Sequence, residues 1–211
     1  MKIFFQNEHF IAVYKEKMTL SVPSRDKEDA RPILGLQLQD YLKQQIYPIH
    51  RLDFEVSGIM LFALTKDSHR EGNKWFEDNL VHKCYHGTAE NIPHNILPEE
   101  PQMWTSQLLR GKKRAYEAPF GKKSITKAIY IGNTGSNSKW QLYPITGRAH
   151  QLRYEMSKHG HPILGDIIYG AKTEQIGIDL EAVELDFCDV NSQEWGLPKK
   201  LNIPLPFPCP R

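Results

Sequence analysis

The sequence predicts an α+β protein built on a largely antiparallel or mixed central sheet. Segments that look like strands outnumber those that look like helices, and the two kinds do not alternate regularly, which argues against a doubly wound fold. Hydrophobic residues make up 40% of the 211 residues and charged residues 25%, the balance of an ordinary folded protein. We therefore expect a single domain over residues 1–211 with one sizeable core.

The first strand and the first helix are expected before residue 50. Residues 10–14 form an apolar run that reads as a strand ending at Lys15. Pro32 suits the first turn of a helix, where its missing N–H would have no partner in any case. The helix itself is indicated by apolar residues at helical spacing, namely Leu34, Leu38, Tyr41 and Leu42.

A second strand and a second helix follow. Residues 58–65 are continuously apolar over the length of a strand, so we expect a strand that is covered on both faces. Ser68 and Glu71 have the spacing of a capping box and predict the start of a helix. The apolar residues that this helix would bury are Trp75, Phe76 and Leu80.

The second half of the chain is expected to be rich in strands. Residues 83–90 suggest one strand, and residues 124–132 and 138–143 read as two antiparallel strands joined by a Gly/Asn/Ser turn. The segment 91–124 is rich in Pro, Gly and Lys, which predicts loops with short strands.

A third helix and a last strand complete the pattern. Lys158, His159 and Gly160 are two cations followed by glycine, which is typical of a helix C-terminus. Residues 178–187 alternate acidic and apolar side chains, as a half-exposed strand does.

The charged residues are unevenly distributed. The formal net charge is only +2, but one segment is strongly basic and contains a single acidic residue, Glu117. Such a segment can contact phosphate groups, although lysines on a solvated loop would give the same pattern. This basic stripe comprises Arg110, Lys112, Lys113, Arg114, Lys122, Lys123 and Lys127.

Several features favour a cytoplasmic protein. No apolar run approaches the roughly 20 residues that cross a bilayer, and the first residues lack the layout of an export signal. Three cysteines (Cys84, Cys188 and Cys209) without CxxC spacing fit a reducing compartment. No two of the nine histidines have metal-ligand spacing with a supporting Cys or Asp, so we expect no metal.

Polar residues of the kinds found in active sites gather in four segments. Residues 48–63 read PIHRLDFEVSGIMLFA, so that His50, Arg51 and Asp53 come directly before the buried strand. Taken alone, Asp53 would be a turn residue or a salt-bridge partner. The other segments are ITGRAHQLRYEMSKHGHPILGDIIYG, FIAVYKEKMTLSVPS around Lys15, and KCYHGTAE.

These segments resemble, in order and from about residue 8 to about residue 205, the motifs of RNA pseudouridine synthases of the RluA type. HRLDFEVSGIMLFAL resembles HRLDxxTSGLLLFAK, and the long segment resembles TGRxHQIRxHxxxxGHPIxGDxxYG. FIAVYKEKMTLSVPS resembles the opening lysine motif and KCYHGTAE the KxYxA segment. The resemblance implies the pseudouridine synthase catalytic fold around a central cleft, without a cofactor. It also implies a small member without the separate amino-terminal S4 RNA-binding domain.

The resemblance also assigns roles to residues. It implies that the chain isomerises specific uridines of structured rRNA or tRNA, with Asp53 as nucleophile, Arg153 as its partner and Tyr85 stacking on the base. Arg51 matches the arginine that takes the space of the flipped nucleotide. The remaining substrate-binding candidates lie at the rim of the pocket or in the basic stripe. They are Lys15, His50, Arg148, Lys112, Lys113 and Lys122.

The chemistry fits these residue types. Breaking a C–N glycosidic bond and rejoining the base through C5 needs a group that attacks and later leaves, as an ionised carboxylate does. Attack at C1′ of the sugar and attack at C6 of the base both remain open. A nearby arginine would keep the carboxylate charged and oriented, and an aromatic face would hold the freed uracil. The nucleotide must first leave its stack.

Three departures and two other function classes bear on this interpretation. Val56 replaces a threonine, Ala149 a threonine or serine, and Asp179-Leu180 a late histidine, but Asp53, Tyr85 and Arg153 are all present. Activity is therefore expected, with the RNA partner recognised as a compact stem-loop by a monomer. The alternatives are an inactive RNA-binding or ribosome-assembly protein with the same fold, and a hydrolase with an aspartate nucleophile.

Overall fold

The structure is a computed structural model and describes residues 1–24, 26, 28–90 and 97–203. Two compact units divide the chain. The first unit contains Met1–His82 together with 182–203, and the second unit contains Lys83–Glu181. The prediction of one domain over the whole chain stays a prediction.

The sheet of the first unit is built from strands at both ends of the chain. β1 pairs with β2, β2 with β4 and β4 with β10, while β3 pairs with β4 and β11 with β10. The strands expected at 10–14, 58–65 and 178–187 are thereby confirmed. Their bounds are β1 Ile3–Gln6, β2 Phe10–Lys15, β3 Tyr47–Pro48, β4 Ser57–Ala63, β10 Leu180–Asp186 and β11 Lys200–Asn202.

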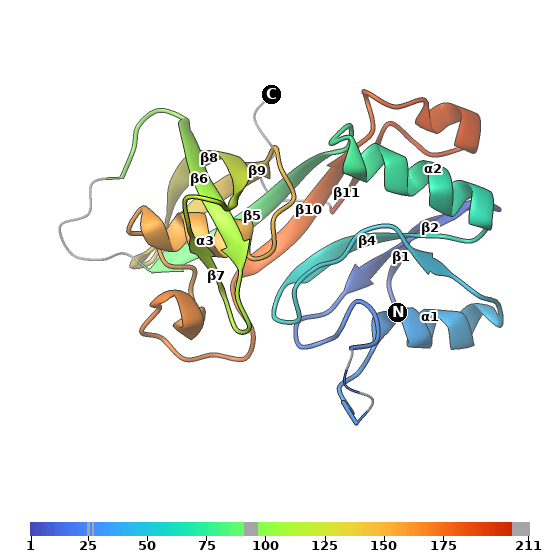
Figure 1. The fold of residues 1–211 in the computed structure, drawn as a ribbon, viewed down its shortest axis with the longest axis horizontal. Helices are drawn as coiled ribbons and strands as arrows, with labels where there is room; N and C mark the ends of the chain where they lie inside the picture. Colours follow the sequence, from blue (N-terminus) through green and yellow to red (C-terminus); the bar gives the residue numbers. More distant parts are fainter. Residues whose placement is uncertain (25, 27, 91–96, 204–211) are drawn as a thin grey trace. The chain divides into compact units, whose positions relative to one another are not determined.

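Two helices cover opposite faces of this sheet, α1 (Leu34–Leu42) and α2 (Lys66–Glu77) (Figure 1). Phe10 of β2 contacts Trp75 of α2, with ring centroids 5.6 Å apart. On the other face, Phe62 of β4 lies next to Gly35 of α1. Every residue of β4 is buried, as its continuous apolar run predicts.

The starts of both helices differ from expectation. α1 begins at Leu34, and Pro32 lies outside it because its carbonyl oxygen accepts a hydrogen bond from Leu20 N at 2.8 Å. α2 has a capping box, but Thr65 is the N-cap and Ser68 is the residue three positions later that completes it. The helix therefore starts three residues earlier than the Ser68–Glu71 spacing predicts. It ends at Glu77, so Leu80 lies beyond it.

The sheet of the second unit has the order β5-β9-β8-β6-β7, and its neighbouring strands are antiparallel. The strands expected at 83–90, 124–132 and 138–143 are confirmed. Their bounds are β5 His82–Glu90, β6 Gln102–Arg110, β7 Ala115–Glu117, β8 Lys122–Thr134 and β9 Asn137–Pro144.

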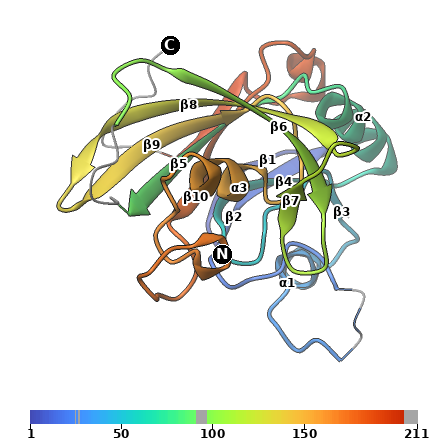
Figure 2. The ribbon, with the colours of Figure 1, turned by 60° about the vertical axis from the view of Figure 1, so that its left-hand side comes forward.

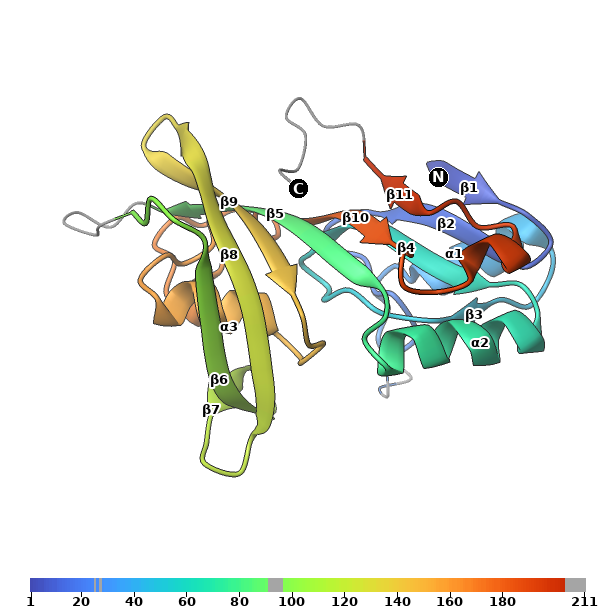
Figure 3. The same ribbon diagram turned by 90° about the horizontal axis from the view of Figure 1, so that it is seen from above.

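The expectation of loops with short strands over 91–124 is wrong for β6, which is nine residues long and lies inside the sheet. Residues 91–96 lie outside the described part of the chain. Along β6, buried Trp104, Ser106 and Leu108 alternate with exposed residues, the period of a half-buried strand. Figure 3 shows β6 beside the long β8.

The connection between β7 and β8 has to cross β6, because these two strands pair with opposite edges of it. Leu108 of β6 is paired with Glu117 on one edge and with Lys122 on the other. Residues 118–121 make the crossing and are called the crossing segment below.

The helix α3 (Gln151–Lys158) packs against this sheet, as Figure 2 shows. It ends at Lys158, with His159 as its C-cap, so the predicted C-terminus is confirmed. Two short 3-10 helices, η1 (Ile167–Tyr169) and η2 (Ser192–Trp195), follow later in the chain. None of the helices in the described residues is long and apolar enough to span a membrane.

Candidate active site

Asp53 lies half-buried in the loop between β3 and β4 of the first unit. The loop turns back on itself, since Val56 N donates to the Asp53 carbonyl oxygen at 3.2 Å. Its backbone is also held on the amino-terminal side of Asp53. Ser21 Oγ donates to the Leu52 carbonyl oxygen at 2.8 Å and accepts from Leu52 N at 3.1 Å. The carboxylate is therefore carried by a backbone with little freedom.

Lys15 holds the other side of the loop. Its fully buried ammonium donates to the carbonyl oxygens of Glu16 at 3.0 Å, Thr19 at 2.7 Å and Phe54 at 3.2 Å. Burial lowers the pKa of Lys15 to about 8, although the negative charge of Asp53 opposes this shift. The structure thus brings Lys15 and Asp53 into one cluster, in which Lys15 anchors the residue that follows Asp53.

His50 and Arg51 have different surroundings. His50 Nε2 accepts a hydrogen bond from Leu61 N at 3.0 Å, and its ring stacks on Phe76 at 4.6 Å between centroids. His50 is thus packed between β4 and α2. Arg51, two residues before Asp53, is exposed.

Gly58 fixes where the loop joins β4. Its φ of +127° lies in a region that side chains disfavour, and a Cβ there would lie 2.3 Å from the Ala182 carbonyl oxygen. Only glycine therefore lets the start of β4 approach β10 this closely.

Tyr85 lies half-buried on β5 of the second unit, opposite Leu142 of β9. Its neighbour Cys84 is buried and is not part of a disulfide, and neither is the exposed Cys188. Lys83 precedes them, and burial lowers its pKa. Cys209 lies outside the described residues.

Arg153, on α3 of the second unit, has a carboxylate partner that sequence reasoning missed. Its Nε donates to Asp166 Oδ2 at 2.7 Å and its Nη2 to Asp166 Oδ1 at 2.9 Å. Both side chains are 1% exposed. Both belong to the long motif, but nothing in their spacing of 13 residues predicts contact. The expected pairing of Arg153 with Asp53 joins residues of different units and stays a prediction.

The turn before α3 is held by Gln151. Gln151 Oε1 accepts from Thr146 Oγ1 at 2.8 Å and from Arg148 N at 3.0 Å, which ties the turn to the first residue of the helix. Arg148 is partly exposed, and its Nε donates to the carbonyl oxygen of Lys123 on β8 at 2.9 Å. Arg148 therefore lies beside the basic stripe.

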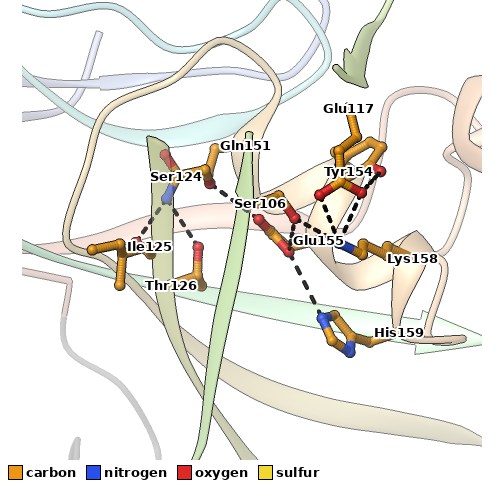
Figure 4. Close-up of polar contacts among 10 residues, drawn as sticks. All are labelled: Ser106, Glu117, Ser124, Ile125, Thr126, Gln151, Tyr154, Glu155, Lys158 and His159. Atoms are coloured by element: carbon orange, nitrogen blue, oxygen red, sulfur yellow. Dashed lines mark hydrogen bonds and ion pairs between the residues drawn. The ribbon is translucent and has the colours of Figure 1, made fainter. Parts of the chain in front are cut away.

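A second polar network follows Arg153 along α3 (Figure 4). The carboxylate of Glu155, which is fully buried, accepts from Ser106 Oγ of β6 at 3.2 Å and from Ser124 Oγ of β8 at 3.1 Å. Burial raises the pKa of Glu155. Glu155 stands where the long motif has its second histidine, a departure that sequence reasoning missed. It links the helix of Arg153 to two strands.

The same network pairs Glu117, the one acidic residue of the basic stripe. Lys158 Nζ lies 2.9 Å and 3.1 Å from its two carboxylate oxygens, and Tyr154 OH donates to it at 3.1 Å (Figure 4). The ion pair with Lys158 lowers the pKa of Glu117. Burial, together with Glu117, raises the pKa of Tyr154 to about 12. The charge of Glu117 is thus balanced from α3.

The basic stripe lies at the end of β6, in the turn between β6 and β7, and on β8. All seven of its cationic residues are exposed. They include Lys112, Lys113 and Lys122, the candidates for phosphate contacts.

Among the described residues, one group of side chains has the donors and the spacing to hold a metal ion. The donor atoms of His82, Cys188 and Asp189 lie within 4.8 Å of one another, and all three residues are exposed. His82 Nε2 and Asp189 Oδ2, at 2.7 Å, already form an ion pair when the histidine is protonated. The expectation of no metal stays a prediction.

Comparison with known proteins gives this arrangement a family context. The family model described as RNA pseudouridylate synthase matches residues 9–158. The dual-specificity RNA pseudouridine synthase RluA of Vibrio vulnificus is 31% identical over 197 residues, which cover 88% of this chain and 77% of that protein. The RluA of Yersinia pestis is 31% identical over 209 residues, covering 94% of this chain and 96% of that protein.

The fold is also found among solved structures. Human RNA pseudouridylate synthase domain containing 1 superposes with a TM-score of 0.74, at 23% identity, over 98% of this chain and 84% of that one. This likeness confirms the α+β fold class predicted from the sequence.

Proposed function

This chain belongs to the RNA pseudouridylate synthase family, and we propose that Asp53 is the nucleophile with which it isomerises uridine. It is an RNA pseudouridine synthase of the RluA type. The observation that carries the assignment of Asp53 is the fixed loop around it. Ser21 holds Leu52 and Lys15 holds Phe54, so the residue between them is presented by a restrained backbone.

The reaction needs no further reactant. A carboxylate oxygen of Asp53 forms a bond to C1′ of the ribose or to C6 of the base, and the C1′–N1 bond breaks. The uracil turns, C5 bonds to C1′, the carboxylate leaves and the proton on C5 is lost, while N1 gains a proton. The product is an isomer of the substrate, and the carboxylate returns to its starting state.

Arg153 and Tyr85 are proposed to assist. A guanidinium near Asp53 would keep its carboxylate charged and aimed at the nucleotide. The bond to Asp166 uses two of the five N–H donors of Arg153 and fixes the plane of the group. Tyr85 is half-buried, so one face of its ring could stack on the base while it turns.

We further propose that the substrate is a stem-loop of rRNA or tRNA, acted on by a monomer in the cytoplasm. The relatives from Vibrio vulnificus and Yersinia pestis are named dual-specificity enzymes, which supports more than one RNA target. The exposed Arg51 would enter the space left by the flipped nucleotide. The basic stripe would bind phosphates on either side of it.

Asp53→Asn tests the assignment. The variant should form no pseudouridine while binding the RNA as the parent does, because only the nucleophile is removed. Pseudouridine mapping of RNA from a deletion strain carrying the parent or the variant gives both the target and the effect. Asp40→Asn, which changes an exposed carboxylate on α1, is the matched control and should modify RNA normally. Parental product formation by Asp53→Asn would refute the proposal.

A further inference from the structure

Two aromatic side chains are exposed within the basic stripe. The side chain of Phe120 is 81% exposed and that of Tyr116 is 46% exposed. Single exposed apolar residues are common on protein surfaces and need no explanation by themselves. Here, however, both residues come between two groups of cations in the sequence, Arg110–Arg114 and Lys122–Lys127.

Phe120 is presented by a backbone that is held in place. It belongs to the crossing segment, whose Gly121 N donates to the Ala118 carbonyl oxygen at 2.9 Å and closes a tight turn. Ala118 N in turn donates to the carbonyl oxygen of Gln107 on β6, also at 2.9 Å. A Cβ on Gly121 would lie 2.5 Å from Gln107, so the segment lies directly on β6. Pro119 restricts the turn further.

This restraint keeps the ring of Phe120 in solvent. Before Phe120 the segment is bonded to β6 through Ala118, and after it Lys122 is paired with Leu108 of β6, yet Phe120 itself stays 81% exposed. An aromatic residue in this position contributes little to folding by removing apolar surface from water. It does offer a flat face whose direction is set before any partner arrives.

The charges around the ring favour an anionic partner. Lys122 and Lys123 follow after Gly121 and are exposed. The only carboxylate nearby in the sequence, Glu117, is paired with Lys158 at 2.9 Å and so does not cancel them. An aromatic face between cations is what single-stranded RNA contacts, with a base on the ring and phosphates on the lysines.

We propose that Phe120 is a stacking platform for an unpaired base of the RNA substrate, other than the uridine that reacts. The inference rests on the proposed function and adds to it a feature of the substrate, namely an unpaired nucleotide bound on the crossing segment. Lys122 and Lys123 bind the phosphates on either side of that nucleotide. Recognition of the stem-loop then depends on its unpaired residues as well as on the reacting position.

The test compares three substitutions of Phe120 in RNA binding. Phe120→Ala and Phe120→Leu remove the aromatic face, and Phe120→Trp keeps it. The first two should weaken binding of a stem-loop with an unpaired loop by about 5- to 100-fold, whereas Phe120→Trp should stay near the parent. Binding of a fully paired duplex should not change, because its bases are stacked on one another.

Salt dependence separates stacking from charge. Phe120→Ala should lower affinity at every salt concentration without altering the slope of log K against log salt, since no phosphate contact is lost. Ile176→Ala is the matched control, because Ile176 is 83% exposed in the second unit but lies in an acidic segment. It should bind like the parent. Thermal unfolding of each variant checks that the fold is kept.

Three results would overturn the proposal. They are parental affinity of Phe120→Ala, parental affinity of Phe120→Leu, and equal losses on duplex and stem-loop RNA. Pseudouridine formation by the parent is measured separately. An active parent with an unaffected Phe120→Ala refutes the stacking site and leaves the proposed function standing. If the parent forms no pseudouridine but its RNA binding still depends on Phe120, the proposed function is refuted and the stacking site stands.

Discussion

Arg153 and Asp166 form a two-point ion pair in which each side chain is 1% exposed. A forked pair of this kind fixes the orientation of the guanidinium as well as its position. It joins the first turn of α3 to the residue that precedes η1. The proposed partner of the nucleophile therefore also has a structural task, and the two roles can be separated by mutation.

Removing one member of this pair should destabilise the protein strongly. Asp166→Ala removes the carboxylate that binds the buried guanidinium at two points and should lower the free energy of unfolding by about 3–5 kcal/mol. In the double variant Arg153→Met/Asp166→Leu neither charge of this pair is left buried, so stability should recover in large part. Urea unfolding measures both. If the double variant is no more stable than Asp166→Ala, the pair does not have the role described. If the double variant is stable but forms no pseudouridine, lost stability does not explain the lost activity. That result would support a role of Arg153 in the reaction.

The buried ammonium of Lys15 should make stability depend on alkaline pH. Its pKa is about 8 in the folded protein, below the ordinary 10.5, so between these values only the unfolded chain binds the proton. The free energy of unfolding should therefore rise with pH in this window, by about 3 kcal/mol in all, and this gain should be lost as the pH falls to 8. Lys15→Met has no titrating group at this position. Urea unfolding from pH 7 to 10.5 should therefore show that the free energy of unfolding of the parent rises relative to that of Lys15→Met. A constant difference across that range would contradict the prediction.

Glu155 should have the opposite effect on the acid side. Burial raises its pKa above the ordinary 4.5, so just above pH 4.5 the folded state holds a proton that the unfolded chain has lost. The contribution of this carboxyl to stability is then full below pH 4.5 and is lost as the pH rises through its raised pKa. Glu155→Gln keeps the size and can still bond Ser106 and Ser124. Urea unfolding from pH 4.5 to 7 should show that the free energy of unfolding of the parent falls relative to that of Glu155→Gln. The same pH dependence in both proteins would contradict the prediction.

Gly58 should tolerate no side chain. Gly58→Ala places a Cβ 2.3 Å from the Ala182 carbonyl oxygen at a φ of +127°, and should cost at least about 2 kcal/mol. Gly147→Ala is the control, because a Cβ there meets nothing within 4 Å. Thermal unfolding distinguishes them. Similar unfolding temperatures for the two variants would show that β4 can move away from β10 at little cost.

The lysines of the basic stripe should set the salt dependence of RNA binding. Replacing Lys112, Lys113 and Lys122 by Gln should reduce the slope of log K against log salt by about 0.7–0.9 for each phosphate contact removed. Lys199→Gln, another exposed lysine, should leave the slope unchanged. Filter binding at several salt concentrations measures this. An unchanged slope in the triple variant would mean that the stripe does not face the RNA.

Local sequence patterns were enough to predict many of the helices and strands. Apolar runs predicted β2 and β4, and the cation-cation-glycine sequence predicted the end of α3, because these signals come from neighbouring residues. β6 was missed. Its inward-facing Ser106 looks like a surface residue until Glu155, 49 positions away, supplies a buried hydrogen-bond partner. No pattern within the strand contains that information.

The same distinction applies to the site. The sequence motifs selected Asp53, Tyr85 and Arg153 as candidate site residues. The roles assigned to them stay a prediction. The contacts that hold them were not visible in the sequence. Lys15 reaches the Phe54 carbonyl and Arg153 reaches Asp166 only through tertiary structure. The start of α2 was misplaced for a simpler reason, since Thr65 and Ser68 cap the helix together and either could have been taken for the first residue.

The path of the crossing segment has a consequence for engineering. At Leu108, β6 is paired with a neighbouring strand on each edge. Residues 118–121 cross it and are bonded to it through Ala118. The tip of the hairpin at 111–114, closed by the bond from Gly111 N to the Arg114 carbonyl oxygen, can therefore be opened without releasing the strand. Two fragments divided at this tip should reassemble when produced together, and a reporter inserted there should leave the rest of the chain folded.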